Sequence, residues 1–188
     1  MCFRGTPCLY QGEELGLEEA EIPFEQLVDP YGIAFFPDFK GRDGCRTPMP
    51  WVTSAPNAGF CSASAKPWLP IPESHRSQAV DRAIRDPESI FHLLRDLLAF
   101  RRTHPSLALG RMTVLESDPR VLRFLREHAG ERTECAFNLS PDPIEVDPPA
   151  DWVSLLGRQR GVSPLSEDGP LLMGPWSWYI RVFEKLNP

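Results

Sequence analysis

Proline placement restricts the fold of this chain more than any other feature of its sequence. The chain has 21 prolines in 188 residues, and nine of them fall between residues 23 and 72. Proline fixes φ and has no backbone N–H, so neither a long helix nor a central strand can run through such a segment. An irregular stretch of about fifty residues is uncommon in a compact domain unless the loop is functional. We therefore predict a long functional loop over residues 18–72.

Residues 41–51 of this loop read Gly-Arg-Asp-Gly-Cys-Arg-Thr-Pro-Met-Pro-Trp. Two glycines and two prolines predict a short, stiff turn. Such a turn can hold the guanidinium donors of Arg42 and Arg46 at fixed angles to a small polar ligand. The alternative is a surface turn whose arginines pair with nearby acidic side chains.

The first sixteen residues combine an apolar segment with an acidic one. Cys2–Tyr10 is largely apolar and predicts a short strand, and polar residues that include Glu13 and Glu14 follow it. Acidic side chains at the carboxyl end of a buried strand are where α/β enzymes place working groups. They are equally typical of the first turn of a helix, where they complement the helix dipole.

One helix is clearly marked in the sequence. Asp86 suits an N-cap, Pro87 suits the first helical position, and His104-Pro105 ends the apolar periodicity. His92 lies in this segment without a partner four residues on, so we expect no metal role for it. The apolar positions that recur at helical spacing are Ile90, Phe91, Leu94, Leu97 and Leu98.

Beyond Leu109-Gly110 the apolar pattern changes to a period of two, which predicts an antiparallel sheet or small sandwich of about 75 residues. In the last strand Trp178, Ile180 and Val182 are expected on one face, and Ser177 and Arg181 on the other. The expected strands are 113–116, 120–127, 133–139, 144–146, Trp152–Leu156 and 176–183.

Composition excludes several classes of protein. A net charge of −6 argues against binding to nucleic acid or to an anionic membrane, both of which favour basic patches. No apolar run approaches the roughly 20 residues of a membrane span, and no leader segment is expected. Five cysteines without a Cys-x-x-Cys pair predict reduced thiols in a cytoplasmic protein, and no metal or organic cofactor is expected.

Residues 5–16 and 41–49 resemble the α-glucosidase and oligo-1,6-glucosidase branch of the α-amylase family, glycoside hydrolase family 13. The segments Pro-Asn-Ala-Gly-Phe (56–60), Lys-Pro-Trp (66–68) and Asp-Pro-Glu-Ser-Ile (86–90) continue the resemblance in the family's order. Several linked segments in one order are more specific than a lone motif. The resemblance extends over the whole chain and is weaker beyond Gly110.

The resemblance implies a fold class and a set of site residues. Residues 1–108 would be an α/β remnant, the last β/α unit of a TIM-type (β/α)₈ barrel with strand 8, its long loop and helix 8. Residues 109–188 would be an all-β antiparallel C-terminal domain, a β-sandwich. Arg42 by preference, and Arg46 as second choice, would donate to a glucose hydroxyl at the bottom of the sugar pocket. Glu14 is a third expected substrate-binding residue.

The catalytic parts of such an enzyme are missing from this sequence. A (β/α)₈ barrel takes about 250 residues. Retaining glycosidases need two carboxyl groups about 5–5.5 Å apart. The sequence has neither the family's Asn-His-Asp segment nor the Arg-x-Asp pattern of its nucleophile. We therefore expect a C-terminal fragment of an α-glucosidase that has no catalytic residue and no activity alone.

Two other functions are compatible with the sequence. The chain could be a non-enzymatic module that binds carbohydrate or protein through its β domain. It could also be one half of a split glucosidase that acts on α-glucoside oligosaccharides with the missing N-terminal barrel portion as its partner. For the module, the candidate stacking residues are Trp152, Trp176 and Trp178.

Overall fold

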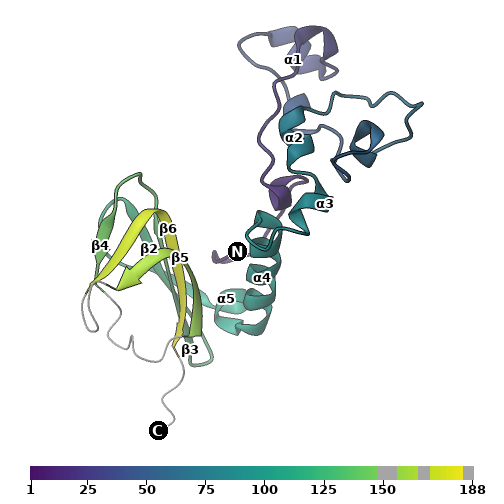
Figure 1. The fold of residues 1–188 in the computed structure, drawn as a ribbon. Coiled ribbons are helices and arrows are strands. Elements are labelled where there is room, and N and C mark those ends of the chain that lie inside the picture. Colours follow the sequence, from purple (N-terminus) through teal and green to yellow (C-terminus); the bar gives the residue numbers. More distant parts are fainter. Residues whose placement is uncertain (148–155, 165–169, 184–188) are drawn as a thin grey trace. The chain divides into compact units, whose positions relative to one another are not determined.

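The computed structural model describes residues 1–147, 156–164 and 170–183 (Figure 1). The chain divides into two compact units. One unit is Cys8–Leu97, and the other combines Met1–Pro7 with Leu98–Pro188. The first seven residues therefore belong to the same unit as the C-terminal part of the chain.

Short helices and loops make up the unit Cys8–Leu97, as the prolines predict. Within its described residues there is no strand. No helix in the described part of the chain is long and apolar enough to cross a membrane. The 3₁₀ helices are η1 Glu13–Leu15, η2 Phe24–Gln26, η3 Asp43–Cys45 and η4 Pro56–Gly59, and the α-helices are α1 Pro30–Phe35, α2 Glu73–Ser77 and α3 Val80–Ala83.

The strand predicted over Cys2–Tyr10 is not formed, and that prediction is wrong for this chain. Gly5 has a φ of 109°, which no regular strand contains. Pro7 lacks the N–H that a ladder needs. No strand of the described sheet pairs with these residues, and an apolar segment alone cannot satisfy its own backbone groups.

Helix α4, Ile90–Thr103, is the predicted long helix, and it ends before His104-Pro105 as expected. Its start differs from the prediction. Ser89 Oγ accepts from the backbone N–H of His92 at 3.4 Å, so Ser89 fills the capping position. Asp86 instead accepts from the N–H of Glu88 at 3.0 Å in the preceding turn. A second helix, α5 Pro105–Leu109, follows directly.

The C-terminal part forms one antiparallel sheet, which confirms the predicted all-β architecture. Its strand order is β1-β2-β3-β6-β4, and β5 pairs with the opposite edge of β6 (Figure 1). Hydrogen bonds join all the described strands into this sheet, with β6 as the shared strand. The strands are β1 Arg111–Val114, β2 Val121–His128, β3 Glu131–Asn138, β4 Ile144–Val146, β5 Leu156–Pro164 and β6 Leu171–Phe183.

Both faces of the central strands are buried. The register aligns Phe124, Cys135 and Ile180 in one row, and each is at most 1% exposed. The next row contains Ala136 and Tyr179, both fully buried on the other face. The core on that face comprises Val121, Ala136, Ile144, Val146, Val162, Leu171, Met173 and Tyr179.

Strand β5 is the element that sequence patterning missed. It pairs with β6 from Leu156 to Pro164, with a register shift between Arg160 and Val162. Gly161 lies at this irregularity with a φ of 66°, which suits glycine at a bulge. The strand predicted over Trp152–Leu156 lies, except for Leu156, outside the described residues.

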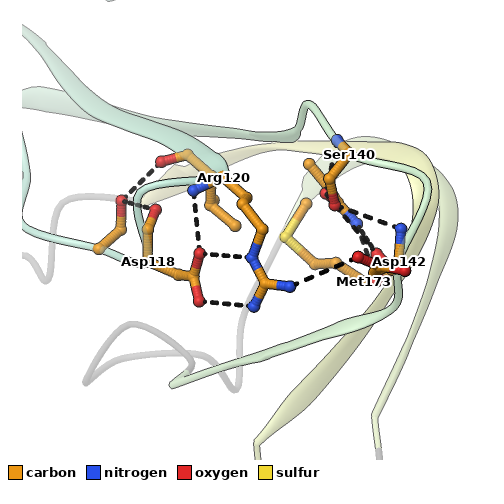
Figure 2. A network of polar contacts seen from close by, with 8 residues as sticks. Asp118, Arg120, Ser140, Asp142 and Met173 are labelled. Carbon is orange, nitrogen blue, oxygen red and sulfur yellow. Dashed lines mark hydrogen bonds and ion pairs between the residues drawn. The ribbon is translucent and has the colours of Figure 1, made fainter.

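Polar contacts fix the turns that follow β3 and precede β2 (Figure 2). Arg120 donates from Nε and Nη2 to the two carboxylate oxygens of Asp118, each at 2.9 Å. These bonds, with one from the Arg120 backbone, lower the pKa of Asp118 to about 2. Arg120 Nη1 also lies 3.7 Å from Asp142, whose carbonyl accepts from Asn138 at 2.7 Å. Both turns lie where Asp and Pro residues predicted them.

Candidate functional site

The candidate site is built on Asp29, which begins helix α1. Its Oδ1 accepts from the backbone N–H of Tyr31 at 3.1 Å, and Pro30 occupies the first helical position. Asp followed by Pro is a favoured start because the side chain caps an N–H that the helix leaves unpaired. The side chain of Asp29 is fully buried, and its second oxygen is left to bind residues of another segment.

Arg42 binds that second oxygen twice. Its backbone N–H donates to Asp29 Oδ2 at 2.9 Å, and its Nε donates to the same oxygen at 3.1 Å. The close approach depends on Gly41, which has a φ of 74° and where a Cβ would lie 2.8 Å from the Cα of Gly32. The predicted stiff turn is therefore docked against α1 by its own glycine and arginine.

Asp43 is a second buried carboxylate in the same cluster. Its Oδ2 accepts from the backbone N–H of Val28 at 2.6 Å and of Asp29 at 2.8 Å. Its Oδ1 accepts from Arg46 Nη2 at 2.7 Å. Asp29 and Asp43 therefore lie side by side across one guanidinium, and that positive charge stabilises both carboxylates.

The pKa of Asp29 lies below its ordinary value. Burial acts to raise this pKa, but the N–H groups of Arg42 and Tyr31 and the Arg42 guanidinium stabilise the charged form more strongly. Asp29 is therefore an ionised anchor for the loop.

Arg42 and Arg46 differ in how much of the guanidinium is left available. Arg46 donates from Nη2 to both aspartates and from Nε to the Arg42 carbonyl at 3.2 Å, and its side chain is 29% exposed. Its guanidinium also lies 5.8 Å from the centre of the Trp68 ring. The side chain of Arg42 is 65% exposed. Among the described residues, neither of its Nη atoms has a partner.

The structure brings Arg42 and Arg46 together, and it does not add Glu14 to them. Glu14 lies in η1, where its Oε2 accepts from the backbone N–H of Gly12 at 2.8 Å. The neighbouring Glu13 accepts from the N–H of Tyr10 at 3.3 Å. Both carboxylates therefore stabilise the turn that leads into η1.

A buried histidine, which the sequence did not single out, connects three segments near the loop. His75 is 3% exposed, and its Nε2 donates to the carbonyl of Glu18 at 2.7 Å. Because a carbonyl only accepts, Nε2 carries the proton of a neutral ring, and Nδ1 of that tautomer accepts from the hydroxyl of Thr47, 3.0 Å away. His75 lines a cavity of about 200 Å³, together with Gln11, Gly12, Glu18, Cys45 and Met49.

Asp29 and His75 are the residues of this region that sequence reasoning missed. The Asp-Pro pair at residues 29–30 was a readable cap signal, although nothing local shows that the carboxylate also reaches Arg42. His75 had no signal at all. Among the described residues, no group of three or more His, Cys, Asp or Glu side chains could hold a metal ion.

Two family models match the chain. Residues 1–110 match the alpha amylase catalytic domain, and residues 112–180 match the maltogenic amylase C-terminal domain.

Two curated relatives give the branch of the family. A probable alpha-glucosidase from Rhizobium meliloti (strain 1021) is 52% identical over 182 residues, which are 97% of this chain and 32% of that protein. An oligo-1,6-glucosidase from Heyndrickxia coagulans is 34% identical over 176 residues, which are 83% of this chain and 31% of that protein. The chain thus spans about a third of the length of the curated relatives it matches.

Solved structures agree with these matches. The alpha-glucosyl transfer enzyme XgtA superposes with a TM-score of 0.80 at 45% identity, over 94% of this chain and 32% of that one. A mutant of the trehalulose synthase MutB, solved with its substrate sucrose, superposes with a TM-score of 0.80 at 26% identity, over 96% of this chain and 36% of that one. The resemblance noted in the sequence is confirmed. Because the catalytic-domain model covers more than half of the chain, the chain belongs to the alpha-amylase family, in its alpha-glucosidase and oligo-1,6-glucosidase branch.

Proposed function

We propose that this chain is the C-terminal part of an α-glucosidase and supplies a sugar-binding arginine, Arg42, without the catalytic groups. The supporting observation is the contrast between the two ends of the Arg42 side chain. Its Nε and backbone N–H are fixed on the buried Asp29, while the side chain is 65% exposed and both Nη atoms are without a partner among the described residues. A planar guanidinium held in this way can donate two parallel hydrogen bonds to neighbouring sugar hydroxyls.

Arg46 and Glu14 have different roles in this proposal. Arg46 already donates to Asp29, Asp43 and the Arg42 carbonyl. Its role in this proposal is therefore to position Arg42 more than to bind sugar. Glu14 would accept from a sugar hydroxyl near η1, since its half-buried carboxylate has a single backbone donor among the described residues.

In this proposal the neighbouring carboxylates Asp29 and Asp43 do not act as a catalytic pair. Asp29 and Asp43 lie side by side, yet both side chains are fully buried and bound by backbone N–H groups and guanidinium donors. A general acid needs a pKa near the working pH, and the pKa of Asp29 is shifted the other way. We infer that the nucleophile and the acid of a retaining mechanism would come from the part of the enzyme that this sequence does not contain.

The exposed apolar surface of the unit Cys8–Leu97 supports the proposal that another protein part covers it. Large apolar side chains are unusually exposed on it, with Tyr31 at 62%, Phe35 at 56% and Trp51 at 49%. Exposed apolar surface of this kind is typical of a face that another protein part covers. The partner we propose is the N-terminal barrel portion of the same kind of enzyme.

A chimera tests the role of Arg42. This chain would replace the matching third of the Rhizobium meliloti relative, and hydrolysis of p-nitrophenyl α-glucoside would be measured. Removing a hydrogen bond from a charged donor costs about 1.5–3 kcal/mol, so Arg42→Ala should lower kcat/KM by about 10- to 150-fold.

The control for this chimera is Arg102→Ala, a change at an exposed arginine of α4 that should leave kcat/KM unchanged. Equal kinetics for Arg42→Ala and the unmodified chimera would refute the proposed contact with sugar.

A non-enzymatic carbohydrate-binding module is the second candidate. Trp176 supports it, because its side chain is 64% exposed on β6 and could stack on a sugar ring. Trp178 is only partly exposed, and Trp152 lies outside the described residues. Retardation of the chain on an amylose gel, abolished by Trp176→Ala, would favour the module. Migration that is unaffected by the polysaccharide would exclude it.

A further inference from the structure

The N-terminal segment Met1–Pro7 packs on the β2–β3 face of its unit. The ring of Phe3 stacks on Phe124, with centroids 5.3 Å apart and planes 20° from parallel. Phe124 is paired in register with Cys135 on β3. Cys2, directly before Phe3, shares a thiol–thiol hydrogen bond with Cys135. The two thiols are in contact there, and the residues are 5% and 0% exposed.

Two buried arginines fasten the backbone of this segment. Arg126 donates from Nη1 to the carbonyl of Cys2. Arg101 donates to the carbonyl of Met1 at 2.6 Å and to that of Gly5 at 2.7 Å. Neither arginine has a carboxylate partner among the described residues. The positive charge around the thiols is therefore not neutralised by an acid within contact distance.

This environment makes the two thiols unequal. The hydrogen bond from Cys135 lowers the pKa of Cys2. Burial opposes that shift, and the charges of the amino group of Met1, Arg101 and Arg126 reinforce it. The pKa of Cys135 is raised by the same hydrogen bond, by burial and by the Cys2 charge, with Glu134 adding to the rise and Arg126 reducing it. Cys2 is therefore the more acidic of the two thiols and the better placed to react as a thiolate nucleophile, and Cys135 keeps its proton.

We propose that Cys2 and Cys135 form an oxidation-sensitive dithiol site that a small peroxide converts to a disulfide. The Cys2 thiolate attacks one peroxide oxygen, the O–O bond breaks, and the departing hydroxide takes up a proton to become water. Cys2 is then a sulfenic acid. Cys135 next attacks the Cys2 sulfur, the S–O bond breaks, and a second water leaves. Two thiols and one hydrogen peroxide thus give one disulfide and two waters.

The disulfide would tie Met1–Pro7 to β3, in addition to the arginine contacts. It would join residues that are far apart in the sequence, and such cross-links constrain the unfolded chain most. This site is distinct from the Arg42 cluster, because it lies in the other unit and uses no residue of that cluster. It is therefore testable whether or not the proposed sugar contact is correct.

Peptide mapping of the full chain tests the site. The folded chain would be treated with hydrogen peroxide, blocked with iodoacetamide, unfolded and digested with trypsin without reduction. Trypsin releases Cys2 in residues 1–4 and Cys135 in residues 133–158, each as the single cysteine of its peptide. We expect these two peptides to be joined, with a mass lower by two hydrogens than their sum, and to separate on reduction.

Oxidation in urea is the matched control. In an unfolded chain, loop closure favours the nearby pair Cys2–Cys8 over Cys2–Cys135 by a factor on the order of 100. The proposal requires the opposite preference in the folded chain, and Cys135→Ser must abolish the linked product. Recovery of Cys135 as a free thiol after oxidation, or the same pairing with and without urea, would overturn it.

Discussion

Replacing Tyr179 with phenylalanine tests the buried polar network of the sheet. The Tyr179 hydroxyl and Arg123 Nε each donate to Glu134 Oε1 at 2.6 Å. Burial, followed by the charge of Glu134, raises the pKa of Tyr179, so the hydroxyl keeps its proton and remains a donor. Tyr179→Phe deletes a hydrogen bond to a charged group, which costs about 1.5–3 kcal/mol. In this variant Glu134 keeps its ion pair with Arg123. The loss of unfolding free energy should therefore stay below the roughly 3–5 kcal/mol that breaking a buried ion pair costs.

Urea unfolding followed by circular dichroism measures this effect. With a slope of about 2 kcal/mol per molar urea, a loss of about 2 kcal/mol lowers the midpoint by about 1 M. Tyr31→Phe makes the same chemical change at a side chain that is 62% exposed, and it should leave the midpoint unchanged. A shift for Tyr179→Phe no larger than that of Tyr31→Phe would refute the network's contribution to stability.

Two further predictions concern pH and the loop. Burial acts to raise the pKa of Glu131, but the hydrogen bonds from Ser106 and His104 outweigh it and hold this pKa below its ordinary value. Stability should therefore fall as the pH drops through the lower, folded pKa. Glu131→Gln should flatten this dependence in urea titrations between about pH 3 and 6, and an unchanged slope would contradict it. A Cβ at Gly44 would lie 2.4 Å from the carbonyl oxygen of Ala20, so Gly44→Ala should displace the loop that contains Arg42. Limited tryptic cleavage after Arg42 should then become faster. An unaltered cleavage rate would contradict the tight packing of this loop.

The fold was largely predictable where local chemistry decides it. Pro105 ends α4 because it pushes His104 out of helical geometry, and the apolar residues of β2, β3 and β6 reflect strands that are buried on both faces. Strand β5 escaped prediction because its sequence, Leu-Gly-Arg-Gln-Arg-Gly-Val-Ser-Pro, contains two glycines and no clear alternation. Its pairing with β6 overrides that weak propensity. For Cys2–Tyr10 the prediction was wrong in the opposite direction: a strand was predicted and none forms. An apolar run forms a strand only beside a pairing partner.

The candidate site was half predictable. The Gly-Arg-Asp-Gly motif identified Arg42 and Arg46, and their resemblance to family positions suggested a role. The partner Asp29 lies 13 residues before Arg42, and no spacing rule connects a helix cap to a distant guanidinium. Of the two alternatives raised for the turn, pairing with nearby acidic side chains is observed, and ligand binding stays a proposal. Arg46 pairs with nearby acidic side chains, and Arg42 pairs through Nε alone and leaves its other donors exposed.

Hydrolysis of p-nitrophenyl α-glucoside by the purified chain alone tests the central claim most directly. The account predicts no turnover above the buffer rate, because the carboxylates of the Arg42 cluster are buried and ion-paired and the family's Asn-His-Asp segment is absent from the sequence. Turnover that purifies with the chain and disappears in Arg42→Ala would contradict it, because a catalytic pair would then exist within these 188 residues.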